Sequence, residues 1–192
     1  MFGGTIETEL STSFAGTAAY AINGNGGVVN IKGGNLKITA NNSNVTYVNI
    51  NATNGIVVVE NLTIQNTNTS SKGVYGFYLS NSTLTFNSGS VITSGASTGV
   101  YGIVSGNSSK VTINNGEFAG DYTSVIFNSS VESINISNGT FGSNSGNVIR
   151  MNAGSLNISG GVFSSISNNT ILYKSNTNIT ISGGTFNCKN SL

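Results

Sequence analysis

The chain has 192 residues, which is enough for one domain with an apolar core. It contains no His and no Trp, and 7% of its residues are charged, for a net charge of +1. The absence of His excludes Ser-His-Asp and Cys-His nucleophile systems, and the lack of a basic run excludes nucleic acid and anionic membrane as expected partners.

The predicted elements follow an eight-residue phrase that recurs along the chain. Its clearest copies are LNISGGVF at 156–163 and ITISGGTF at 179–186. Aligned on their last residue, the phrases end in chain order at Ile6, Leu36, Ile64, Val91, Phe118, Phe141, Phe163 and Phe186. The steps are 30, 28, 27, 27, 23, 22 and 23 residues, so residues 1–110 form longer repeats than residues 111–192.

Within each phrase, apolar and polar residues alternate. The first position holds Val29, Val57, Leu84, Val111, Ile134, Leu156 and Ile179. The third position holds Ile31, Val59, Phe86, Ile113, Ile136, Ile158 and Ile181. The residue between them is mostly polar, which is typical of a strand with one buried face. A pair such as Gly33-Gly34 then ends the strand, because Gly tolerates the backbone of tight corners, and a short second strand follows.

A third strand is predicted before each phrase. Seven residues before each first position stand Ile22, Ile50, Phe77, Val104, Phe127, Ile149 and Leu172, all of them apolar. Each repeat therefore forms a coil of three short strands separated by corners. Because one such coil cannot bury its apolar face alone, stacked coils must share one continuous core.

These columns predict an all-β fold, a single-domain parallel β-helix that spans residues 1–192. We expect about seven to eight coils of 22–30 residues, with three short strands in each coil. Right-handed coiling is the default, from the general preference of parallel crossovers. The competing fold is a sandwich of β-hairpins, which would not keep three columns in fixed order at a 22–23-residue step.

The phrase ITISGGTF has an apolar-polar-apolar strand, a Gly-rich corner and an aromatic end. It resembles the repeats of right-handed parallel β-helices of the pectate-lyase-like superfamily. More narrowly, it is similar to the repeats of bacterial surface adhesins, autotransporter passengers and sugar-binding β-helix modules. The resemblance covers nearly the whole chain and implies a scaffold, which by itself specifies no single activity.

The acidic residues do not form a predicted catalytic pair or a calcium cluster. Glycoside hydrolysis requires two carboxyl groups at a defined separation. Glu117 and Asp121 flank Phe118 on one rung, and we expect them to be a solvated pair. The remaining acidic residues occupy different places in the repeat and are Glu7, Glu9, Glu60 and Glu132. We therefore expect a protein that is not an enzyme and that uses no cofactor or metal.

The candidate ligand-binding residues lie in the longer repeats. Segments 37–46, 65–73 and 92–99 are predicted as loops, and stacked repeats place such loops together, commonly on a binding face. Tyrosine beside Asn and Lys suits stacking on sugars or packing against a protein. The candidates are Tyr47, Tyr75, Tyr78, Tyr101, Asn68 and Lys72. The alternative is that these tyrosines only fill the interior of wider coils.

Two functions fit this pattern. The first is an adhesin-like protein, extracellular or on the cell surface, whose loops and tyrosines bind a glycan or a surface protein. The second is a structural protein of a fibre, sheath or phage appendage, in which uncapped coils stack end to end by self-association.

The sequence also bears on location. The first residues lack the basic and apolar regions of a signal peptide, as expected for a mature form, a fragment of a longer protein or a cytosolic protein. No apolar run approaches the roughly 20 residues that cross a bilayer, so membrane insertion is not expected. Cys188 is the single cysteine and is expected to be an incidental thiol.

Overall fold

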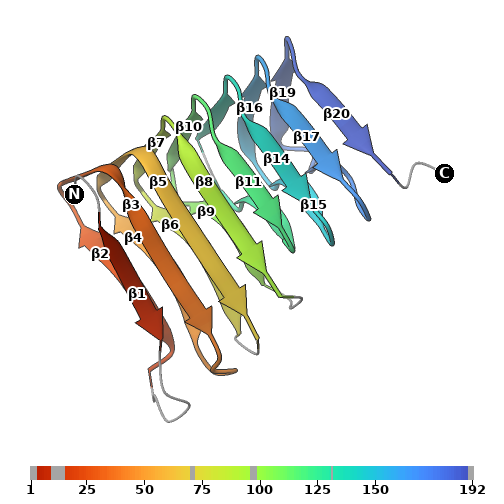
Figure 1. The fold of residues 1–192 in the computed structure, drawn as a ribbon. Coiled ribbons are helices and arrows are strands. Elements are labelled where there is room, and N and C mark those ends of the chain that lie inside the picture. Colours follow the sequence, from red (N-terminus) through yellow and green to blue (C-terminus); the bar gives the residue numbers. More distant parts are fainter. Residues whose placement is uncertain (1–3, 10–15, 70–71, 96–98, 131, 190–192) are drawn as a thin grey trace.

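The structure, a computed structural model, describes residues 4–9, 16–69, 72–95, 99–130 and 132–189. Within these ranges the chain forms twenty strands and no helix. All paired strands run parallel to their neighbours. The chain winds as a β-solenoid of about six turns, stacked from the red N-terminal end to the blue C-terminal end (Figure 1). The predicted parallel β-helix is confirmed.

The strands belong to two hydrogen-bonded sheets. Sheet A contains the strands on both sides of the predicted glycine corner. Its thirteen strands are β1 (Thr5–Glu9), β3 (Val28–Ala40), β5 (Ile56–Asn68), β7 (Thr83–Phe86), β8 (Gly89–Ser94), β10 (Lys110–Ile113), β11 (Glu117–Gly120), β13 (Ser133–Ile136), β14 (Thr140–Ser143), β16 (Gly154–Ile158), β17 (Val162–Ser165), β19 (Thr177–Ile181) and β20 (Thr185–Cys188). Sheet B has seven strands: β2 (Ala18–Asn25), β4 (Thr46–Thr53), β6 (Gly73–Ser80), β9 (Val100–Gly106), β12 (Ser124–Asn128), β15 (Asn147–Met151) and β18 (Ile171–Tyr173).

The predicted number of coils is slightly too high. Seven strands of sheet B are separated by six circuits of the chain, which gives about six turns. The column that ends at Phe186 has eight members because it includes Ile6 of β1. That strand pairs with β3 and belongs to a partial turn.

In sheet A the predicted columns lie in register from turn to turn. The column of first positions runs in register from Val29 to Ile179, and the column of third positions runs from Ile31 to Ile181. The column of last positions runs from Ile6 to Phe186. The members between Ile31 and Phe163 are at most 2% exposed. These columns form the core because each turn covers the apolar face of the one before it.

In sheet B the predicted inner column is right in four turns and wrong in three. The inner residues that align from turn to turn are Ile22, Ile50, Phe77, Ile103, Ile126, Ile149 and Ile171. Val104, Phe127 and Leu172 each follow an inner residue by one position. They therefore belong to the outer face, because successive side chains of a strand point to opposite faces.

A longer corner causes this error. Phe77 precedes Leu84 by seven residues, whereas Ile103 precedes Val111 by eight. Counting back a fixed seven residues therefore lands on the wrong face wherever the corner has one extra residue. The exposure of the three residues differs, since Leu172 is 39% exposed and Phe127 is half-buried, whereas Val104 is only 8% exposed.

The longer repeats within residues 1–110 form the wide turns of the solenoid, and these turns have long strands where loops were predicted. Strands β3 and β5 have 13 residues each and stay paired from Val28–Ile56 to Ala40–Asn68. Much of segments 37–46 and 65–73 is therefore strand, because the inward apolar alternation continues through Ile38 and Ala40. These residues pack in a second core cluster with Ala19, Val45, Tyr47 and Val74.

The shorter repeats within residues 111–192 form the narrow turns of the solenoid, and these turns enclose a stack of phenylalanine rings. The ring centroids of Phe118 and Phe141 are 5.3 Å apart, those of Phe141 and Phe163 4.9 Å, and those of Phe163 and Phe186 4.8 Å. Neighbouring planes are tilted by 5° to 11°. Gly102 of sheet B faces this stack, and a Cβ there would lie 3.2 Å from the Phe118 ring. The missing side chain lets sheet B approach the large rings of sheet A.

Candidate functional site

The candidate site lies on the outer face of sheet B. Along β6, Tyr75 is half-buried and Tyr78 is exposed, while Phe77 is fully buried. The pairing of β6 with both neighbours skips Gly76, so the strand alternation is interrupted there and Tyr75 and Tyr78 share the outer face. Tyr75 aligns with Tyr101 on the next strand. The register position of Tyr78 continues through Val104, Phe127, Arg150 and Leu172 on the four following strands. The register thus collects aromatic side chains on one face from residues far apart in the sequence.

Four rings on this face contact one another in series, and we name them the aromatic row: Tyr78, Tyr75, Tyr101 and Phe127. The ring centroids of Tyr78 and Tyr75 are 6.1 Å apart. The Tyr75–Tyr101 and Tyr101–Phe127 distances are both 5.4 Å. Beyond Phe127, the Cζ atom of Arg150 lies 5.4 Å from the Phe127 ring centroid, a cation–π distance. The row therefore crosses β6, β9 and β12 and ends in a cation on β15.

The rings are packed against one another but remain accessible. Tyr78 is 39% exposed, and Tyr75, Tyr101, Phe127 and Arg150 are half-buried. Burial raises the pKa of Tyr75 above its ordinary value, and the neighbouring Tyr101 and Tyr78 raise it further. The Tyr75 hydroxyl therefore stays neutral and can both donate and accept hydrogen bonds.

The six predicted candidates separate into three groups. Tyr75, Tyr78 and Tyr101 come together in the row. Tyr47 is fully buried in the second core cluster, where its hydroxyl donates to Oδ1 of Asn41 over 3.2 Å. Asn68 is 3% exposed at the end of β5. Burial removes both of these side chains from the surface that a ligand can reach.

Lys72, the remaining candidate, is exposed in the turn before β6. Its backbone N–H donates to the carbonyl of Val45 over 3.2 Å. None of the ring contacts of the row involves it. Lys72 is therefore near the site in sequence but is not a member of the row.

Two residues of the site were missed from the sequence. Counting back seven residues places Phe127 in the core column, and no pattern in the sequence marks Arg150. The signal that identifies them is the register, because both align with Tyr78 through Val104. Tyr20, 42% exposed on β2, also lies on this face and aligns with Tyr75 through Val48.

Glu117 and Asp121 differ in their surroundings. Asp121 accepts hydrogen bonds from the backbone N–H of Gly95 over 3.1 Å and from Nδ2 of Asn144 over 3.0 Å. The carboxylate thus joins the corners of three successive turns. Glu117 is exposed. Among the residues that the structure describes, no three His, Cys, Asp or Glu side chains gather as a metal site would require.

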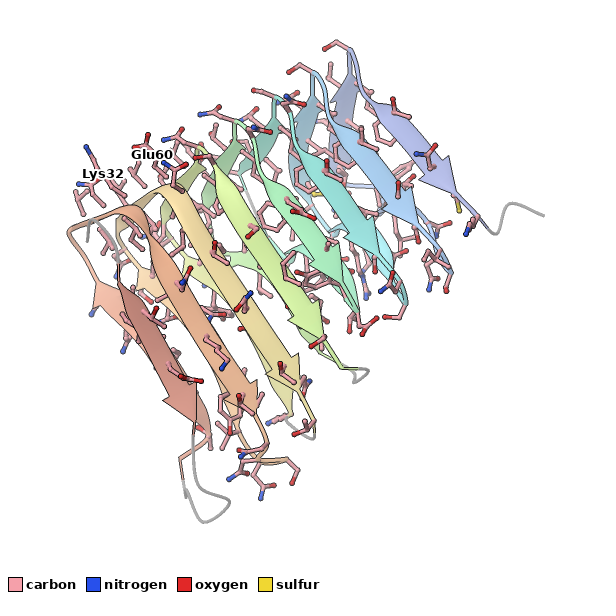
Figure 2. The ribbon with its side chains drawn as sticks, viewed as in Figure 1. Lys32 and Glu60 are labelled. Carbon is pink, nitrogen blue, oxygen red and sulfur yellow. The ribbon has the colours of Figure 1, made fainter. Side chains whose placement is uncertain are left out.

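Other charged residues face one another across neighbouring turns. Lys32 and Glu60 align on β3 and β5 and project outward from the corner of sheet A (Figure 2). Nζ of Lys37 lies 2.6 Å from Oε1 of Glu7. Pairs of this kind at the surface contribute little stability, and they lie on sheet A, away from the aromatic row.

The last described turn exposes its inner columns. Ile181 is 47% exposed, and an open hollow of about 470 Å³ is lined by Ile171, Tyr173, Thr177, Ile179 and Ile181. Phe186 ends the phenylalanine stack and is half-buried. This lining is mostly apolar, so it offers a surface for packing rather than for chemistry.

No protein-family model, curated protein or solved structure matches the chain. The described part of the chain contains no helix of the length and apolar character needed to cross a membrane. The function is therefore inferred from the chemistry of the outer face of sheet B.

Proposed function

We propose that the chain is a non-enzymatic binding protein, extracellular or on a cell surface, that holds a glycan on the aromatic row. The observation that carries this proposal is the unbroken series of ring contacts from Tyr78 to Phe127 on an accessible face. Large rings that contact one another lose little conformational freedom on binding, because each has only two rotatable side-chain bonds.

A glycan fits this face better than a flat apolar partner does. Pyranose rings present C–H groups that pack on aromatic rings and hydroxyls that need hydrogen bonds. The position of Tyr78 is occupied on the two preceding strands by Asn51 and Asn23. Nδ2 of Asn51 donates to Oδ1 of Asn23 over 2.6 Å, and these amides retain further donors and acceptors for hydroxyls.

The spacing of the turns also favours an extended ligand. Successive strands of a sheet are about 4.8 Å apart, so the rings on β6, β9 and β12 repeat along the solenoid axis. An extended saccharide chain running along that axis places successive sugars over successive turns. This geometry supports binding of an oligosaccharide rather than of a single sugar.

A glycan array with three variants tests the proposal. Tyr101 contacts both Tyr75 and Phe127, so Tyr101→Ala should weaken binding roughly three- to ten-fold, as expected for one aromatic contact. Phe127→Ala should act similarly. Tyr173→Ala is the matched control, because Tyr173 is 62% exposed but belongs to the last turn and not to the row. Failure of every glycan to bind, or equal binding by wild type and Tyr101→Ala, would refute the proposal.

The exposed inner columns of the last described turn favour a second candidate, end-to-end assembly with a second copy of the chain. Its support is the half-exposed Ile181 beside an apolar hollow of about 470 Å³, which a further turn in the same register would cover. Sedimentation of the chain and of Ile181→Lys over a range of concentrations tests it. Concentration-dependent association that the variant abolishes is expected, and a monomer at all concentrations contradicts it.

A further inference from the structure

Arg150 is the single charged residue in the seven strands of sheet B. The other strand residues of this sheet include no Lys, Asp or Glu. Arg150 lies on the outer face, in register with Phe127 and Leu172. A cation on a face whose strands have no carboxylate creates a positive potential at that end of the aromatic row.

The guanidinium group of Arg150 is positioned by Phe127. Its Cζ atom lies over the ring, 5.4 Å from the centroid, which is a cation–π distance. The guanidinium has five N–H donors in a rigid planar fork. Neither of the ion pairs found among the described residues involves Arg150. The residue therefore has bidentate donor capacity for an anionic ligand.

A second cation lies at the same end of the row. Lys174 follows β18, and its backbone N–H donates to the carbonyl of Met151 over 3.0 Å. This bond fixes Lys174 beside the turn that contains Arg150, and its side chain is exposed. Arg150 and Lys174 therefore both lie toward the C-terminal end of the aromatic row, while the register position of Tyr78 holds neutral amides on β2 and β4.

We propose that the glycan bound by the aromatic row is acidic and that Arg150 binds its carboxylate or sulfate group; this inference rests on the function proposed above. A planar guanidinium forms two parallel N–H···O bonds with either group. The neutral sugars next to the anionic group then stack on Tyr101 and Tyr75. Arg150 thus determines the direction of the bound chain, with the anionic residue at β15 and neutral residues toward β6.

The experiment measures dissociation constants by calorimetry for three forms of one ligand. The probes are a neutral lactosamine tetrasaccharide and the sialylated and sulfated forms of the same tetrasaccharide, with polyglutamate as an anion that is not a sugar. The proteins are wild type, Arg150→Gln and Arg150→Lys. Circular dichroism checks that both variants keep the wild-type strand content. The sialylated and sulfated arms distinguish a carboxylate from a sulfate as the group that Arg150 binds.

Wild type should bind at least one acidic form about ten-fold more tightly than the neutral form, as expected for a charge-assisted hydrogen-bonded pair. Arg150→Gln should lose this preference and bind the acidic and neutral forms with affinities within about two-fold of each other. Arg150→Lys should keep part of the preference, because lysine is a point charge without the planar fork.

Four results overturn the inference. Equal binding of neutral and acidic forms by wild type refutes the acidic ligand but leaves the proposed glycan binding intact. Retention of the preference by Arg150→Gln refutes the role of Arg150. Binding of polyglutamate as tight as that of the acidic glycan shows a general anion site instead. Absence of binding to all three saccharides refutes the proposed function as well.

Discussion

Phe141 is the position at which loss of one side chain should destabilise the solenoid most. Its side chain is fully buried, and its ring is stacked between Phe118 at 5.3 Å and Phe163 at 4.9 Å. Truncation of a buried phenylalanine to alanine costs about 3 to 5 kcal/mol. Because two ring pairs are lost together, we expect Phe141→Ala to fall near the upper end, at about 4 to 5 kcal/mol.

Phe186 provides the matched comparison within the same stack. It is half-buried and contacts only Phe163 among the described rings, at 4.8 Å. Removing it deletes one ring pair and less buried surface, so Phe186→Ala should cost about 2 kcal/mol. In a solenoid each turn contacts mainly its neighbours. The end substitution should therefore loosen the last turn, whereas the central one should weaken the whole array.

Urea unfolding followed by far-UV circular dichroism measures both variants, because the chain has no tryptophan for fluorescence. The variant Phe141→Leu separates ring stacking from burial, since it keeps most of the apolar volume, and it should cost about 1 to 2 kcal/mol. If Phe186→Ala is as costly as Phe141→Ala, or if Phe141→Ala costs less than about 2 kcal/mol, the stack is not the main support of the narrow turns.

Two further predictions concern close packing and pH. A Cβ at Gly76 would lie 2.6 Å from the carbonyl oxygen of Gly102, so Gly76→Ala should lower the free energy of unfolding by about 1 to 3 kcal/mol. Gly142 is the control, because the nearest atom to a Cβ there is 3.9 Å away. Gly142→Ala should leave the thermal midpoint unchanged or raise it. Tyr122 is fully buried and donates to the carbonyl of Val91 over 2.6 Å, and burial raises its pKa above the ordinary 10.0. Its neutral form is favoured in the folded state, so this stability is present below about pH 10 and is lost as the pH rises above it. The free energy of unfolding should fall as the pH rises above about 10, and Tyr122→Phe should show a smaller fall.

Sheet A was predictable to the residue because its columns are fixed by two independent signals. The alternation within the phrase places Ile134 and Ile136 inside, and the glycine corner then fixes the position of Phe141. The observed register pairs Ile134 with Leu156 and Phe141 with Phe163. Both signals are local, so neither depends on the length of the rest of the turn.

Sheet B was only partly predictable because it has no such corner marker. Ile126 and Phe127 are adjacent and both apolar, as are Ile103 and Val104, so either member of each pair completes an apolar column. The choice depends on the length of the corner that follows, which three-dimensional pairing decides. Since Phe127 is the ring over which Arg150 lies, this one-residue ambiguity concealed the end of the candidate site.

The wide turns show a different limit. Segment 65–73 looks like a loop because Asn and Thr are common there, yet Gln65 to Asn68 pair with the preceding strand. Residues 65–68 are held as a strand because they pair with β3, whose Ile38 and Ala40 are buried. A polar segment that pairs with a neighbour of clear strand pattern inherits its conformation, which a reading of one repeat at a time does not reveal.

The variability of the outer column of sheet B separates binding from folding. The inner column of this sheet is apolar in all seven strands, since stacking requires it. The outer column runs through Asn23, Asn51, Tyr78, Val104, Phe127, Arg150 and Leu172, from amide to aromatic to cation. Such a mixture shows that the fold does not dictate these residues. The rings and the cation that contact one another on consecutive turns of this column are the residues on which the proposed binding rests.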